Sequence, residues 1–138
     1  MTASTRAANV AAYQMVATHG GVAAADPHRL ILMLLDGALS RVAQARGCSE
    51  RGAAADRLTH LNRALAILGE LRASLDPSAG AIAGNLDSLY DFMCRQILLA
   101  HVDKRTEILD GVTALLNEIR GAWNAIPPDA RSRAVEAR

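Results

Sequence analysis

The chain has 138 residues, a length that suits one domain, and its 15 basic and 14 acidic side chains give a net charge of +1. This balance argues against a nucleic-acid partner, and aromatic residues, at 3%, are too few for a base-stacking surface. Hydrophobic residues make up 51%, much of it alanine, which favours packed helices over sheets. No apolar run is long enough to span a membrane, and the N-terminus does not resemble a signal peptide, so we expect a cytoplasmic protein.

The domain organisation is predicted from three stretches of different composition. Residues 1–25 form a short mobile N-terminal arm, in which residues 7–18 could make a helix that ends at Gly20-Gly21. A lone segment of this kind is barely stable without packing. Residues 26–126 carry the helical domain, and residues 127–138, which are small and charged, form a disordered tail.

The first helix of the domain begins with a clear start signal. Asp26 is a good N-cap, and Pro27 suits the first helical position, where its missing N–H costs nothing. The helix is predicted to run to about Arg46 and to stop near Gly47. Residues 30–35 are six apolar residues in a row and cover its whole circumference, since a helix turns about 100° per residue. This helix therefore lies at the centre of a bundle or shows a second apolar face to another segment or a partner.

The second helix is predicted to start between Ser49 and Asp56 and to end at Leu75-Asp76-Pro77, because a residue before proline is pushed out of the helical region. Its apolar stripe is Leu58, Leu61, Leu65, Leu68 and Leu75, with Ile67 and Leu71 alongside.

The third and fourth helices complete the pattern. The third opens soon after Pro77 and ends around His101, with an inner face of Ile82, Leu86, Leu89, Met93, Ile97 and Ala100 and with Tyr90 beside it. The fourth is capped by Asp103 and is stopped by Pro127-Pro128, with a stripe of Leu109, Val112, Leu116, Ile119, Trp123 and Ile126. Four helices joined by short turns predict an all-α fold, an antiparallel up-down four-helix bundle with crossing angles of roughly 20°.

The sequence carries no recognisable catalytic or metal-binding motif. It lacks His-Glu-x-x-His, Glu-x-x-His, Cys-x-x-Cys, Gly-x-Ser-x-Gly and a phosphate-binding glycine loop. We therefore expect no enzymatic activity, no cofactor and no metal site. Cys48, placed in a turn, and Cys94, placed in a helix as core filler, are expected to stay reduced. His60 and Arg63 resemble part of a histidine phosphotransfer helix, which also belongs to a four-helix bundle.

An excess of large apolar residues on the first two helices leaves several interpretations open. These helices are either fully packed at the centre of the bundle, or they border a groove that receives an amphipathic helix or an extended chain. A dimerising bundle would use the same excess for self-association. A phosphotransfer protein with His60 as its reactive residue is the alternative from another functional class.

A resemblance to a known family rests on four segments in a fixed order and on one N-terminal dipeptide. They are Pro27–Ala38, Leu65–Asp76, Asn85–Met93, Leu115–Trp123 and the pair Tyr13-Gln14. With these segments the chain resembles the flagellar secretion chaperone FliS family over roughly residues 13–124. It differs from residues common in that family at Leu35, Cys94 and His101.

The resemblance implies an antiparallel four-helix bundle that binds newly made flagellin in the cytoplasm. It implies that the disordered C-terminal region of flagellin wraps round the bundle and gains helical structure. Binding then blocks premature filament assembly and keeps the subunit ready for type III export, with no catalysis or nucleotide. The flagellar export gate and a co-chaperone are further candidate partners.

Eight residues are our candidates for contact with the partner: Tyr13, Gln14, Met33, Leu34, Leu61, Leu68, Leu71 and Tyr90. Aromatic residues are favoured anchors, and the flexible thioether of Met33 suits imperfect partners. Trp123 is assigned to the core. The arm around Tyr13 and Met15 is predicted to cover part of the groove until flagellin docks.

Overall fold

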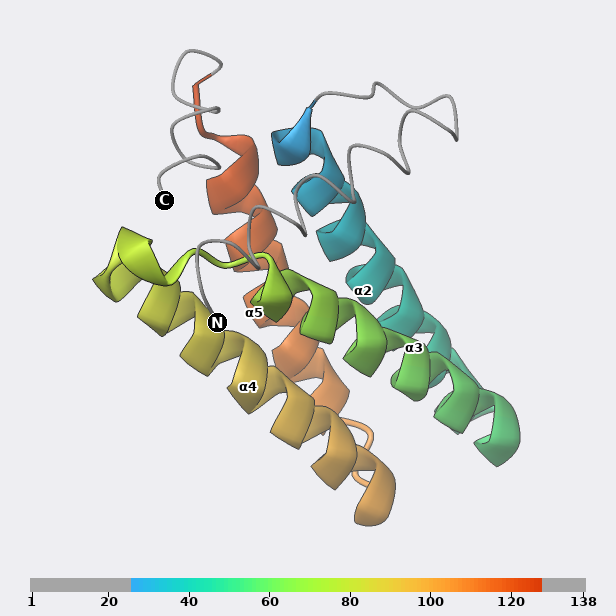
Figure 1. Ribbon diagram of the computed structural model, residues 1–138. Helices are drawn as coiled ribbons and strands as arrows, with labels where there is room; N and C mark the ends of the chain where they lie inside the picture. Colours follow the sequence, from blue (N-terminus) through green and yellow to red (C-terminus); the bar gives the residue numbers. More distant parts are fainter. Residues whose placement is uncertain (1–25, 128–138) are drawn as a thin grey trace.

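The structure, a computed structural model, describes residues 26–127, which form four α-helices and one short 3₁₀ helix. The elements are α2 (Pro27–Glu50), α3 (Ala54–Ala73), η1 (Pro77–Ala79), α4 (Ala81–Val102) and α5 (Ile108–Asn124). Successive helices run in opposite directions, and α5 closes the ring by packing against α2 (Figure 1). The predicted all-α antiparallel bundle is confirmed. The predicted arm, and the predicted tail beyond residue 127, lie outside the described residues.

Helix α2 starts as predicted but runs longer. The Asp26 carboxylate accepts a hydrogen bond from the backbone N–H of Arg29 at 3.2 Å and so caps the first turn. The predicted stop near Gly47 is wrong, because the left-handed backbone that ends the segment falls at Gly52, with φ 71°. Cys48 therefore lies buried in the last turn of α2 and not in a loop.

The connection between α4 and α5 corrects a second expectation. Asp103 does not cap the start of α5; it is the C-cap residue of α4. Lys104 then adopts a left-handed conformation with φ 55°, which reverses the chain, and α5 begins only at Ile108. The stop at Pro77 is confirmed, since α3 ends at Ala73.

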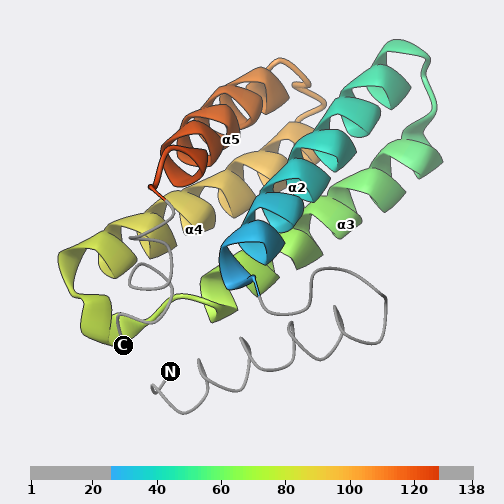
Figure 2. The same ribbon diagram turned by 90° about the horizontal axis from the view of Figure 1, so that it is seen from above.

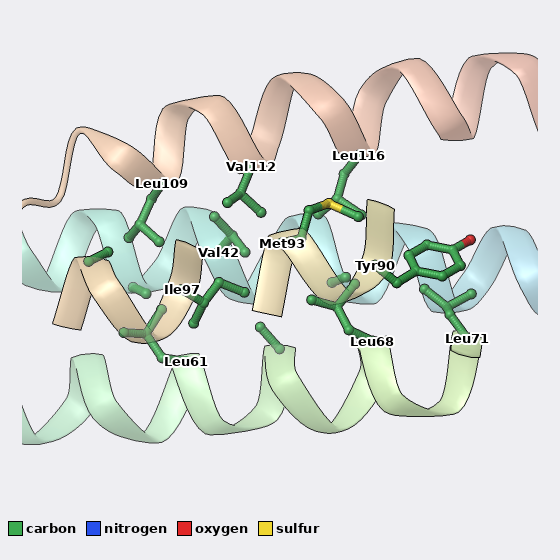
Figure 3. Close-up of a cluster of buried hydrophobic side chains, with 14 of the residues drawn as sticks. Val42, Leu61, Leu68, Leu71, Tyr90, Met93, Ile97, Leu109, Val112 and Leu116 are labelled. Carbon is green, nitrogen blue, oxygen red and sulfur yellow. The ribbon is translucent and has the colours of Figure 1, made fainter. Parts of the chain in front are cut away.

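The core is a continuous set of apolar side chains that recur every three or four residues on each helix. Figure 3 shows many of them meeting in the space between the four helices. Its members are Leu35, Ala38, Val42 and Ala45 on α2, Leu61, Ala64, Leu68 and Leu71 on α3, Tyr90, Met93, Ile97 and Ala100 on α4, and Leu109, Val112 and Leu116 on α5. Cys94, which is free, packs against this core as expected.

Leu58 and Ile82, which the sequence pattern predicts to face the core, are exposed instead. Leu58 is 40% exposed, because Arg57 turns inward in the same turn and its Nε is buried. Ile82 is 70% exposed, because the neighbouring Ala83 takes the inward position at the start of α4. Both errors fall in the first turns of helices, where the apolar periodicity has few residues to define it.

Ion pairs on the outside join neighbouring helices. Arg46 pairs with Asp110 and Arg120 with Asp36 between α2 and α5, while Arg72 bridges α3 to Asp87 and Asp91 on α4. The hydrogen bond to Asp87 raises the pKa of Arg72. Exposed pairs contribute only about 0.2–1 kcal/mol each, so apolar packing dominates the stability of the bundle.

Truncation of a core residue tests this balance. Leu116→Ala should lower the free energy of unfolding by about 2–5 kcal/mol, since Leu116 is fully buried and its removal leaves a cavity. Leu98→Ala is the matched control, because Leu98 is 52% exposed and its loss should cost about 0.5 kcal/mol or less. Urea unfolding followed by circular dichroism measures both, and equal losses would contradict the described packing.

Burial of Tyr90 predicts a sensitivity to alkali. Desolvation by burial raises the pKa of Tyr90 to about 12, whereas an unfolded tyrosine titrates near about 10. Between these values the unfolded chain loses the phenolic proton and the native chain keeps it, so the free energy of unfolding falls as pH rises. Tyr90→Phe keeps the ring and cannot ionise. Wild type should therefore lose about 2 kcal/mol relative to this variant between about pH 9 and pH 12 in urea titrations. Parallel pH profiles would show that the phenol is not desolvated.

Candidate binding groove

One end of the bundle carries an apolar groove of about 680 Å³, which we call the end groove. Figures 1 and 2 show this end, where α2 begins, α5 ends and the chain crosses from α3 to α4. The groove is lined by Pro27, Ile31 and Leu35 of α2, Leu71 of α3, Ser74, Leu75, Asp76 and Ala79 of the crossing segment, Ile82, Ala83, Asn85, Leu86, Leu89 and Tyr90 of α4, Leu115, Glu118, Ile119, Ala122 and Trp123 of α5, and Ile126.

Small side chains and the short segment between α3 and α4 explain why this end of the bundle stays open. Helix α3 ends at Ala73 and α4 starts only at Ala81, so a short crossing segment covers the end of the core. Gly80, with φ 75°, turns the chain there into α4. Ala83 on α4 and Ala122 on α5 also line the groove, and their methyl groups leave space that larger side chains would fill.

The chemistry of the end groove is that of an apolar binding surface. Its polar members are Ser74, Asp76, Asn85 and Glu118. Asp76 accepts hydrogen bonds from the backbone N–H and the hydroxyl of Ser78, at 2.9 and 2.7 Å, and so holds the crossing segment. Ile82 offers a large apolar side chain to solvent at the rim. This lining can bind apolar groups and use a few polar atoms to orient them.

Within residues 26–127, no three His, Cys, Asp or Glu side chains are arranged to hold a metal ion. None of the helices in that range combines the length and apolarity needed to cross a bilayer.

A set of reciprocal contacts between His28 and Trp123 joins α2 to α5 beside the groove. The rings stack with centroids 5.2 Å apart and an interplanar angle of 12°. The Nε2 atom of His28 lies 2.7 Å from the carbonyl oxygen of Trp123. The indole Nε1–H of Trp123 donates to the carbonyl oxygen of His28 at 3.0 Å. We call these contacts the His28–Trp123 clasp.

The structure brings two of the candidate contact residues to the groove. Leu71 and Tyr90 line it, and Figure 3 shows the Tyr90 hydroxyl directed away from the rest of the core cluster. Leu61 and Leu68 are fully buried core residues, so direct contact with a partner would require the helices to separate.

The remaining candidates lie elsewhere. Met33 is 45% exposed on α2, and Leu34 packs against the core; neither lines the end groove. Tyr13 and Gln14 fall outside the described residues, as does the arm expected to cover the groove. All eight remain predictions as partner contacts.

The apolar run at residues 30–35 has no single environment. Leu35 is buried, Ile31 and Leu35 line the groove, and Met33 faces solvent. The second apolar face expected of this helix is thus partly uncovered within the described part of the chain.

Sequence reasoning missed most groove residues because it assigned them to the core. The apolar periodicity assigns Ile82, Leu86 and Leu89 to the inner face of a helix, and it assigns Trp123 to the core. Trp123 in fact packs on the core with one part and lines the groove with another. The available signal was the cluster of alanines and glycines near Pro77, where small residues leave an end uncovered.

His60, the alternative reactive residue, lies between α2 and α3. Its Nδ1 is 3.0 Å from Nη1 of Arg41, and because a guanidinium only donates, Nδ1 is the acceptor and carries no proton. His60 is partly buried and lies apart from the groove lining.

Comparisons with known proteins identify the family. The flagellar protein FliS family matches residues 8–130. The chain is 42% identical to the flagellar secretion chaperone FliSB of Pseudomonas aeruginosa, over 83% of this chain and 91% of that protein. It is 38% identical to the flagellar secretion chaperone FliS of Vibrio cholerae, over 86% and 88% of the two chains. It is 38% identical to the protein of the same name from Salmonella typhimurium, over 90% and 93%. The chain therefore belongs to the FliS family of flagellar secretion chaperones.

Proposed function

We propose that the chain is a cytoplasmic export chaperone that binds the disordered C-terminal region of flagellin. Binding would prevent premature polymerisation and keep the subunit competent for flagellar type III secretion. The observation that carries this proposal is the end groove, an open apolar surface on a bundle whose family acts in flagellar secretion.

The energetics favour an apolar groove as the binding surface. A segment that is disordered when free loses chain entropy on binding, which costs about 2–5 kcal/mol. At about 25 cal/mol per Å², burial of about 200 Å² of apolar surface offsets the upper end of that cost. Leu86, Leu89 and Ile119 are the kind of side chain that supplies such an area when a partner covers them.

The shape of the site favours an amphipathic helix as the bound form. Helices α4 and α5 supply most of the groove lining, and their apolar residues repeat every three or four positions along it. A partner helix with apolar residues at positions i, i+3 or i+4 and i+7 presents the matching face. Asn85 and Glu118 supply polar atoms that can orient the partner. A flagellin segment held in this way has its apolar face covered and cannot use it for filament contacts.

Self-association is the competing use of exposed apolar surface. Phe92, Leu98, Leu99 and Val102 lie exposed on α4 outside the end groove, and a dimer could bury them. Sedimentation of the protein alone and with a flagellin C-terminal peptide separates the two functions. A stable 1:1 complex supports the chaperone, whereas a dimer that ignores the peptide supports the dimerising bundle.

A charge placed in the groove should abolish partner binding. Ile82→Asp puts a carboxylate at the apolar rim, where a docked helix would bury it without a counter-charge. Its affinity for a flagellin C-terminal peptide, measured by titration calorimetry, should fall by more than about tenfold. An aspartate near the start of α4 is compatible with the helix dipole, so the fold should persist.

Leu98→Asp is the matched control for this variant. It places the same charge on the same helix, outside the groove and near the C-terminal end, where the helix dipole makes it more costly to stability. It should bind the peptide as wild type does. Equal affinities for both variants and wild type, or a loss confined to Leu98→Asp, would exclude the end groove as the binding surface.

A further inference from the structure

We propose that His28 is a positioning residue for the end groove and acts through Trp123. His28 is 2% exposed and is not among the residues that line the groove, whereas Trp123, with which it stacks, is one of them. This inference rests on the proposed function of the groove. It assigns a role in partner binding to a residue that does not contact the partner directly.

The directions of the two hydrogen bonds in the clasp follow from the atoms that take part in them. A carbonyl oxygen only accepts hydrogen bonds, so the His28 Nε2 that lies 2.7 Å from the Trp123 carbonyl must carry a proton. The indole donates in the opposite direction, to the carbonyl of His28. Two side chain–backbone hydrogen bonds of opposite direction and one ring stack thus join the same two residues.

The hydrogen bond from His28 supplies a partner to a backbone carbonyl at the end of α5. Trp123 lies in the last turn of α5, where backbone carbonyls lack intrahelical partners. Its carbonyl accepts from the backbone N–H of Ile126 at 3.3 Å, and the His28 imidazole adds a shorter second bond. His28 lies in the first turn of α2. The clasp therefore joins the start of α2 to the end of α5, through two residues that are 95 positions apart in the chain.

The clasp lies next to residues that line the groove on both helices. Pro27 and Ile31, on either side of His28 in α2, also line the groove, as do Trp123 and Ile126 on the α5 side. The bond from Nε1 and the stack fix the rotation of the indole, so the surface offered to a partner is set before binding. Pre-set side chains cost less entropy when a complex forms, which favours affinity.

The chain suits a direct test, because Trp123 is its one tryptophan and all indole fluorescence comes from that residue. His28→Phe keeps a flat ring that can stack and removes the donor to the Trp123 carbonyl. His28→Gln keeps a donor and loses the ring. Arg46→Ala is the matched control, since it removes the contact with Asp110 of α5 and the contact with Thr106, just before α5, at the opposite end of the bundle.

The readouts are fluorescence anisotropy of the free protein and affinity for a flagellin C-terminal peptide. His28→Phe should lower the anisotropy, increase quenching by acrylamide and weaken peptide binding by about tenfold. His28→Gln should fall between wild type and His28→Phe, and it serves alone if the phenylalanine variant does not fold. Arg46→Ala should keep wild-type anisotropy and affinity even where its free energy of unfolding drops.

The outcomes separate this inference from the function on which it rests. A wild-type protein that does not bind the peptide overturns the proposed function and this inference with it. Wild-type binding with unchanged affinity and anisotropy in both His28 variants overturns the inference alone. An affinity loss in Arg46→Ala equal to that of His28→Phe would also overturn it, since the effect would then follow stability.

Discussion

Apolar side chains from four helices meet along the axis of the bundle and hold the helices together. Leu35, Leu68, Met93 and Leu116 are fully buried, one from each helix, and their spacing of three or four residues brings the helices together. The ion pairs on the outside are exposed and weak, so they contribute little to the free energy of unfolding, although they join specific pairs of helices. Because the packing is close along the middle of the bundle, an opening is tolerated at one end, where the core finishes in alanines and a short crossing segment.

Hydrogen bonds made by residues of the groove lining fix the shape of the opening. Asp76 holds the crossing segment through Ser78, and the His28–Trp123 clasp holds the ends of α2 and α5. These hydrogen bonds are partly buried, so the loss of one partner is more costly than at a fully exposed site. A surface whose side chains are held in place before binding leaves most of the ordering cost to the partner.

Much of the fold was predictable from local signals, and the candidate site was less so. The Asp26-Pro27 start, the stop at Pro77 and the stripe of α5 as far as Trp123 are set by neighbouring residues, and the structure confirms them; Ile126, the last residue of the predicted stripe, lies beyond the end of α5. The helix end predicted at Gly47 is wrong, because glycine is tolerated inside a packed helix. The helix start predicted at Asp103 is wrong, because this aspartate ends α4 and does not begin α5. The groove was not predictable residue by residue, because it is a gap between segments far apart in the chain. Periodicity marks Ile31, Leu86 and Trp123 as apolar positions and does not show that their far sides remain uncovered.

If a flagellin tail occupies the end groove, it should slow hydrogen exchange in the residues that it covers. In hydrogen exchange of the full chain, with and without the C-terminal segment of flagellin, we expect new protection concentrated in residues 82–90 and 115–126, the stretches of α4 and around the end of α5 that line the groove. Protection confined to other surfaces, or a complex that forms without slowing exchange in these two stretches, would contradict occupation of the groove.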